Sequence, residues 1–146
     1  KSFINGLTGI TAETLKDAPS VEEVIKDFQE FVGSLPMVGY NAAKSDLPIL
    51  AEHGLDYSQQ YKVDLYDEAF ERRSSDLHGI ANLKLQTVAS FLGFQGQSHN
   101  SLEDARMTAR VYESFLESDQ ARELLGTESS LSNNPFGGLD LSQLFE

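Results

Sequence analysis

Near its far end the chain reads His99-Asn100-Ser101-Leu102-Glu103-Asp104-Ala105-Arg106-Met107-Thr108-Ala109. Apolar and small residues continue from this stretch at helical spacing, namely Ala105, Thr108, Val111, Tyr112 and Phe115. This period predicts a helix over about residues 101–117. Asp104 then falls in the first turn of that helix, and His99 falls in the loop before it.

A carboxylate beside a histidine in a loop suits one kind of chemistry. The Asp104 carboxylate can hold a divalent cation, and His99 can take a proton from a water that the cation activates. This combination is typical of metal-assisted hydrolysis of a phosphodiester. The plainer alternative is that Asp104 only complements the helix dipole and that His99 is an ordinary surface residue.

Composition narrows the class of protein. The chain has 146 residues, of which 40% are hydrophobic, so it is long enough for one domain with a core. It lacks cysteine, which excludes disulfides and thiolate metal sites. We find no apolar run long enough for a membrane span and no leader resembling a signal peptide, so we expect a cytoplasmic protein and no membrane partner. The net charge of −12 argues against binding nucleic acid through a broad basic surface. Bound cations could still supply positive charge for phosphate groups at one site.

Short apolar runs alternate with helical patterns before this stretch. Strands are expected at residues 37–40 and 61–65, and a turn at residues 12–16. Helices are expected at about residues 21–32, 46–53, 65–73 and 85–92. The first helix opens with the capping-box pair Ser20 and Glu23, and one apolar face follows: Val21, Val24, Ile25, Phe28, Phe31 and Val32. Alternation of this kind indicates an α/β fold, yet two or three strands are few for a free-standing sheet.

A second acidic residue opens a helix. Gly39-Tyr40-Asn41 leaves the first predicted strand, and Asp46 begins the helix that follows. Ligands of open α/β sheets gather at the carboxyl ends of strands, so Asp46 is a candidate metal ligand. The alternative is an ordinary acidic residue in a first helical turn.

These motifs together resemble the RNase H-like 3′–5′ exonucleases of the DnaQ or DEDDh type, a family that includes the epsilon subunit of bacterial DNA polymerase III. The resemblance covers about residues 4–117. It is carried, in the family's order, by Gly9-Ile10-Thr11, Ala18-Pro19, Asn41-Ala42, Asp46, Val63-Asp64-Leu65, Leu92-Gly93 and His99 to Ala105.

Two departures from the family pattern stand out. Between Asn41 and Asp46 the chain has one residue more than usual, with Ser45 in place of Phe and Tyr40 in place of His. The family's Asp-x-Glu strand, which supplies two of four acidic ligands, is absent. Asp64 does not replace it, because its counterpart in the family lies on another strand and is not a ligand.

The resemblance implies an RNase H-like exonuclease domain, a mixed sheet flanked by helices, truncated at its N-terminus. It implies metal-dependent 3′–5′ hydrolysis of single-stranded DNA or RNA ends with Mg²⁺ or Mn²⁺. Asp46 and Asp104 would be the ligands and His99 the general base. Leu7, Thr8, Gly9 and Asn41 would contact nucleic acid. Two carboxylates cannot hold two close dications, so we expect the chain alone to be inactive. The alternatives are a catalytically inactive nucleic-acid-binding or scaffold module on the same fold, and an unrelated α/β domain.

From about residue 126 the composition changes. Residues 127–138 are rich in Ser, Asn, Gly and Pro, and the last eight residues form a small acidic amphipathic peptide. We therefore expect an exonuclease-like domain over residues 1–125 and a flexible tail or linker over residues 126–146. The tail could bind a partner such as a polymerase or a sliding clamp, or simply be a frayed end.

Overall fold

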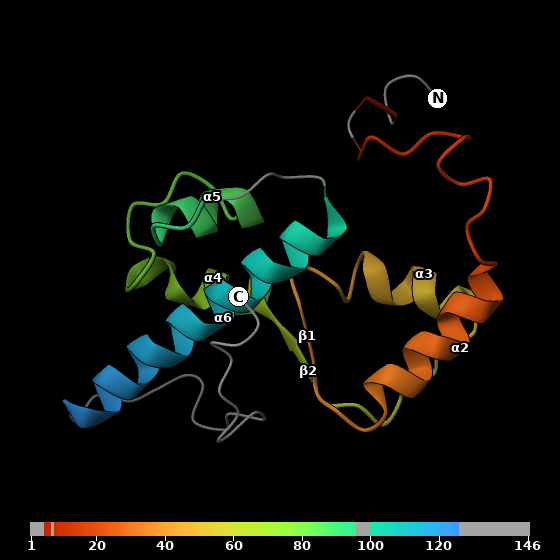
Figure 1. Cartoon of the computed structure of the whole chain (residues 1–146). Helices are drawn as coiled ribbons and strands as arrows, with labels where there is room; N and C mark the ends of the chain where they lie inside the picture. The colour runs from red at the N-terminus through yellow and green to blue at the C-terminus, as the bar shows by residue number, and fades with distance from the viewer. Residues whose placement is uncertain (1–4, 7, 96–99, 126–146) are drawn as a thin grey trace.

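The computed structural model describes residues 5–6, 8–95 and 100–125, and over these it has α/β architecture (Figure 1). Both expected strands and every expected helix are present. In chain order the elements are α2 (Val21–Val32), β1 (Met37–Gly39), α3 (Asp46–Glu52), β2 (Lys62–Asp64), α4 (Leu65–Glu71), the 3-10 helix η1 (Arg72–Ser74), α5 (Leu85–Phe91) and α6 (Ser101–Leu124).

The two strands form a parallel pair. Met37 stands opposite Lys62, Val38 opposite Val63 and Gly39 opposite Asp64. In the described part of the chain this pair is the whole sheet, so the mixed sheet expected from the resemblance is represented there only by parallel strands. Both strands end at the same edge, where β1 leads into a loop before α3 and β2 leads directly into α4.

The main core lies where β2, α4, α5 and α6 meet. Its buried residues are Val63, Leu65, Ala69, Leu77, Val88, Ala89, Met107, Val111, Tyr112 and Phe115. Val38 of β1 packs against this core, so the sheet contributes one face to it. Burial raises the pKa of Tyr112 to about 12, which keeps its hydroxyl neutral.

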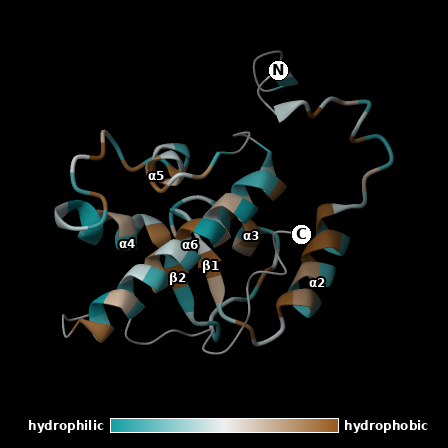
Figure 2. Ribbon diagram, turned by 60° about the vertical axis from the view of Figure 1, so that its left-hand side comes forward, coloured by the Kyte–Doolittle hydropathy of each residue, from teal (hydrophilic) through white to brown (hydrophobic). Residues whose placement is uncertain are grey.

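Helix α2 begins as the sequence predicts, and much of its apolar face stays exposed. Ser20 and Glu23 form the capping box, and the chain leaves the helix at Gly33, whose φ is 52°. Of the predicted apolar face only Ile25 and Val32 are buried, whereas Phe31 is 81% exposed. Figure 2 shows this helix at one side of the molecule, with hydrophobic residues along it. The apolar face that the sequence predicts is therefore present, but most of it is not buried in the described part of the chain.

Helix α6 starts at the predicted position but continues to Leu124, past the expected end near residue 117. Its last turns carry Asp119, which pairs with Arg72 of η1, and Arg122, which pairs with Asp76 in the segment that follows η1. Helical propensity alone does not predict these last turns of α6, because the ion-pair partners that stabilise them lie elsewhere in the chain. No helix among the described residues is both long enough and apolar enough to span a bilayer.

Candidate functional site

The loop after β1 and the start of α3 place Asp46 on the surface. Asp46 is the first residue of α3 and is exposed. The backbone N–H of Leu47 donates to the carbonyl of Ala42 at 2.9 Å, which joins the first turn of the helix to the loop. The Ser45 hydroxyl lies 2.6 Å from Asp46 Oδ2 and 2.9 Å from the Asn41 carbonyl oxygen. Its single proton can be donated to one of these two acceptors at a time. An exposed carboxylate at a helix start is accessible to a cation from solvent.

Asp104 is held by a well-capped helix. Asn100 is the N-cap of α6, and its side chain accepts from the backbone N–H groups of Leu102 and Glu103. The Asp104 N–H donates to the Asn100 carbonyl at 2.8 Å. Asp104 is half-buried, while Thr108, one turn further on, is buried and donates its hydroxyl to the Asp104 carbonyl. The backbone that carries Asp104 is therefore fixed.

Three parts of the predicted site lie toward one end of the molecule. Helix α6 packs against β1. In both ribbon views the start of α6, the carboxyl end of β1 and the N-terminal segment lie toward that end (Figures 1 and 2). Thr8 and Gly9 belong to this segment, and Gly9 has a φ of 72° with open space around it. Position 9 favours glycine because of its left-handed backbone conformation, and not because a side chain would lack space.

The described residues do not form a complete metal centre. In this part of the chain no three His, Asp or Glu side chains lie close enough together to hold a metal ion. His99 and Leu7, the predicted base and one predicted nucleic-acid contact, lie outside the described residues. Roles for Asp46, Asp104, Thr8, Gly9 and Asn41 accordingly stay predictions.

Two residues that contact or belong to the loop before α3 have structural roles that sequence reasoning did not assign. The Tyr40 hydroxyl donates to the Leu83 carbonyl at 2.7 Å, and its ring meets Tyr66 edge-on with centroids 6.2 Å apart. Burial raises the Tyr40 pKa far above its usual value, with smaller contributions from Tyr66 and Asp64. Tyr40 therefore ties the loop after β1 to residue 83. The family usually has His at this position, and the presence of Tyr instead was the sequence signal that could have pointed to this role.

Asp64 is the second residue that was missed. Its carboxylate accepts hydrogen bonds from the backbone of the loop after β1, including Asn41, whose own φ is 57°. Among the described non-glycine residues Asn41 alone has a positive φ, and Asn tolerates that region better than most side chains. An aspartate at the junction of a strand and a helix is a recognisable N-cap signal, but the loop it reaches is distant in sequence.

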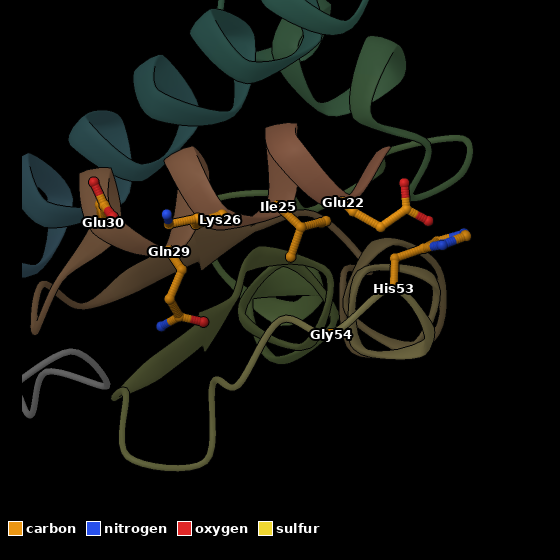
Figure 3. Close-up of a pocket in the computed structure, with 7 residues that line it drawn as sticks. All are labelled: Glu22, Ile25, Lys26, Gln29, Glu30, His53 and Gly54. Atoms are coloured by element: carbon orange, nitrogen blue, oxygen red, sulfur yellow. The ribbon is translucent and has the colours of Figure 1, made fainter. Parts of the chain in front are cut away.

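Two cavities adjoin these elements. One of about 260 Å³ lies along the two strands and the loop, and Gly39, Ala42, Leu47, Asp64 and Asp67 are among its lining residues. The other, of about 400 Å³, lies between α2 and the end of α3 (Figure 3). Its lining includes His53 and Glu22 but none of the predicted site residues. The strand-side cavity is not lined by the predicted site residues either, but Ala42 and Leu47 place it along the loop and the helix start that carry Asn41 and Asp46.

The parallel strands, Asp46 at the start of α3 and Asp104 in the first turn of α6 are consistent with an α/β domain of the exonuclease type. The RNase_T family, described as exonucleases, matches residues 1–112. The chain belongs to this family. The match spans α2 to the middle of α6 and includes Asp46, Asp64 and Asp104.

Individual relatives are components of DNA polymerase III. The chain is 32% identical over 117 residues to a PolC-type DNA polymerase III of Caldanaerobacter subterraneus subsp. tengcongensis, covering 80% of this chain and 8% of that protein. It is 29% identical over 119 residues to the DNA polymerase III subunit epsilon of Aquifex aeolicus, covering 78% of this chain and 56% of that subunit. A shorter segment of 37 residues is 51% identical to the PolC-type polymerase of Bacillus subtilis, 25% of this chain and 3% of the polymerase. The chain thus spans only part of each of these relatives. No solved structure matches it significantly.

Proposed function

We propose that this chain is the catalytic domain, or part of one, of a metal-dependent 3′–5′ exonuclease. The observation that carries the proposal is the family match over residues 1–112, which spans both helix-opening aspartates. The relatives are DNA polymerase III proteins, which supports a nucleic-acid substrate and a polymerase partner in the cytoplasm. The substrate is a single-stranded 3′ end of DNA, with RNA as the alternative.

The donor set suits one hard cation. Mg²⁺ binds through oxygen ligands and commonly takes one or two carboxylates while keeping several waters. Asp46 and Asp104 supply two carboxylates that solvent can reach, which is the kind of donor set that a single Mg²⁺ or Mn²⁺ takes. Such an ion lowers the pKa of bound water and polarises a phosphoryl oxygen. We propose one ion rather than two, because no group of three His, Asp or Glu side chains that could hold a metal lies among the described residues.

The chain's own residues have separate tasks in this proposal. Asp46 and Asp104 hold the ion. His99 accepts the proton of the attacking water, while Leu7, Thr8, Gly9 and Asn41 contact the terminal nucleotide. The assignments of His99 and of the nucleotide contacts rest on the resemblance. The tail over residues 126–146 differs in composition from the rest of the chain. This difference makes it a candidate contact for a polymerase or a sliding clamp.

The second candidate function is a catalytically inactive nucleic-acid-binding module. The absence of a three-donor metal group among the described residues favours it. Because two carboxylates hold a cation weakly, we expect the 146-residue chain alone to cleave at no more than about a thousandth of the rate of a four-carboxylate enzyme.

The two candidates are separated by cleavage of single-stranded DNA labelled at either end, in Mn²⁺, by the 146-residue chain and by the longest natural protein that contains it. The exonuclease proposal expects mononucleotide release from the 3′ end by the longer protein. His99→Ala should lower that rate about 10²- to 10⁴-fold and leave metal binding nearly intact. Binding without metal-dependent cleavage in either protein would favour the inactive module.

A further inference from the structure

One carboxylate joins the two strand ends beside the candidate site. Asp64 is the last residue of β2 and the N-cap of α4. Its Oδ1 accepts from the backbone N–H of Asn41 at 2.6 Å and from that of Tyr66 at 3.1 Å. Its Oδ2 accepts from the backbone N–H of Ala43 at 3.2 Å. Both oxygens are thus engaged with backbone donors, two of which belong to the loop after β1.

That loop has a demanding conformation. Asn41 has a φ of 57°, in the left-handed region. The loop also turns back closely over β1, because a Cβ atom added at Gly39 would lie 2.4 Å from the Cβ of Ala42. Left-handed backbone and close approach both cost free energy and persist only where surrounding contacts enforce them. The Asp64 carboxylate supplies such contacts.

The loop conformation is transmitted to the start of α3. The Ala42 carbonyl accepts from the backbone N–H groups of Ser45 at 3.3 Å and Leu47 at 2.9 Å. The two bonds hold the residues immediately before and after Asp46. A change at Asn41 to Ala43 therefore moves the backbone from which the Asp46 carboxylate projects.

We propose that Asp64 is a positioning residue for the metal-binding carboxylate of Asp46, which it holds through the Asn41–Ser45 loop. The inference rests on the proposed function for the metal ion that Asp46 would bind. The contacts between Asp64 and the loop do not depend on that function. It gives Asp64 a role distinct from ligation, since the carboxylate is already used by three N–H groups. Partners that orient metal ligands typically change metal affinity about 10- to 100-fold when removed.

A purely structural alternative is that Asp64 matters only as the cap of α4. Asp64→Ser distinguishes the two roles. Serine is about as good an N-cap as aspartate, so α4 keeps its start. Its single side-chain oxygen lies nearer the backbone and cannot serve the N–H groups of both Asn41 and Ala43. Asp67→Ser is the matched control, because Asp67 is an exposed carboxylate in the first turn of α4 that borders the same cavity.

The experiment uses the 146-residue chain labelled with ¹⁵N. Amide hydrogen exchange is followed at Asn41, Ala43 and in α4, and Mn²⁺ is titrated while the broadening of the Leu47 and Ala105 signals is recorded. For Asp64→Ser we expect faster exchange at Asn41 and Ala43, unchanged exchange in α4, and Mn²⁺ binding weakened about 10- to 100-fold at Leu47. Asp67→Ser should match the wild-type chain in all three respects.

Slow exchange at Asn41 and Ala43 in Asp64→Ser, or Mn²⁺ binding equal to that of the wild-type chain, would overturn the positioning role. Loss of exchange protection throughout α4 would overturn it as well, in favour of the capping role. If Mn²⁺ does not broaden Leu47 in the wild-type chain, the proposed function fails at this site. Exchange at Asn41 and Ala43 then decides by itself whether Asp64 holds the loop.

Discussion

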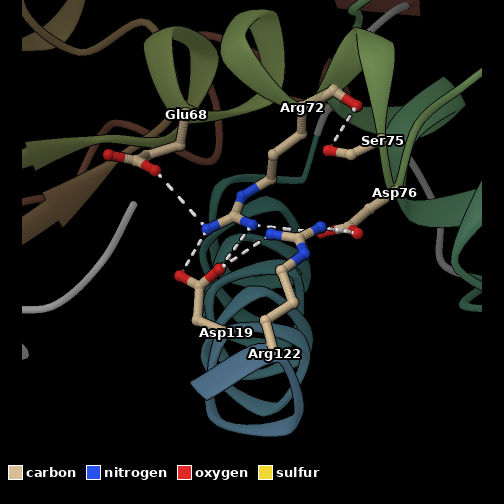
Figure 4. A network of polar contacts seen from close by, with 6 residues as sticks. All are labelled: Glu68, Arg72, Ser75, Asp76, Asp119 and Arg122. Carbon is tan, nitrogen blue, oxygen red and sulfur yellow. Dashed lines mark hydrogen bonds and ion pairs between the residues drawn. The ribbon is translucent and has the colours of Figure 1, made fainter. Parts of the chain in front are cut away.

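The guanidinium of Arg72 and the carboxylate of Asp119 form a buried two-bond ion pair between η1 and α6, with Nη1–Oδ1 at 2.8 Å and Nη2–Oδ2 at 2.6 Å. Arg72 is 1% exposed and Asp119 3% exposed. Figure 4 shows Glu68, Asp76 and Arg122 arranged around the pair. The Arg72 guanidinium also lies 4.5 Å from the centre of the Phe115 ring. This network fixes the C-terminal half of α6 against the rest of the domain.

Removing Asp119 should therefore be costly. Asp119→Ala leaves the buried Arg72 charge without its closest partner, and we expect about 3–5 kcal/mol of lost unfolding free energy in urea titrations. The control is Glu103→Ala, which breaks the exposed pair with Arg106 and should cost under about 1 kcal/mol. Similar losses in the two variants would contradict the description of Arg72 and Asp119 as a buried pair.

Glu68 predicts a pH dependence of stability. Burial raises its pKa above the usual range, and the opposing attraction of Arg72 does not fully offset this. A raised pKa in the folded state means that Glu68 favours folding most at low pH and progressively less as pH rises through that value. Glu68→Gln removes this dependence, so its stability relative to the wild-type chain should increase between about pH 4 and pH 7. Urea titrations across this range check the sign, and a relative decrease would mean that the ion pair with Arg72 dominates.

The exposed face of α2 predicts a contrast between two phenylalanines. Phe31 is 81% exposed and Phe115 is fully buried. Phe115→Ala should cost about 3–5 kcal/mol, whereas Phe31→Ala should stay within about 0.5 kcal/mol. Both values come from chemical denaturation of the 146-residue chain. A loss above about 2 kcal/mol for Phe31→Ala would show that this face is covered in solution.

Asn41 allows backbone and side-chain roles to be separated. Asn41→Gly suits the left-handed backbone and should keep the stability of the domain, while Asn41→Ala should lose about 1 kcal/mol. If the Asn41 side chain contacts nucleic acid, both variants should bind a fluorescent single-stranded oligonucleotide more weakly in anisotropy titrations. Wild-type affinity in Asn41→Gly would remove Asn41 from the proposed nucleotide contacts.

The sequence predicts the elements of this fold well where the signals are local. The capping box of Ser20 and Glu23, the end of α2 at Gly33 and the aspartates in the first turns of α3 and α6 follow from short patterns, and the structure has them all. Burial of α2 could not be predicted, because periodicity shows that a face is apolar but not that a partner covers it.

Contacts between distant segments could not be predicted in this way. Arg72 and Arg73 are adjacent and alike in sequence, yet only Arg72 is buried, because only its side chain reaches Asp119 across 47 residues. Asp64 likewise meets Asn41 across 23 residues. Such pairs depend on how the elements come together. Asp46 and Asp104 could be selected from the sequence because each falls in the first turn of a predicted helix, which is a local signal.

The most direct test of the account is a double-mutant cycle on Mn²⁺ affinity, measured by electron paramagnetic resonance on the 146-residue chain with Asp46→Asn, Asp104→Asn and the double variant. If one ion bridges both carboxylates, each single variant should lose most of the binding, and the double variant should lose little more, because residues that act as a unit are not additive. Binding that is unchanged in either single variant, or losses that add fully in the double variant, would contradict a shared metal site and with it the proposed exonuclease centre.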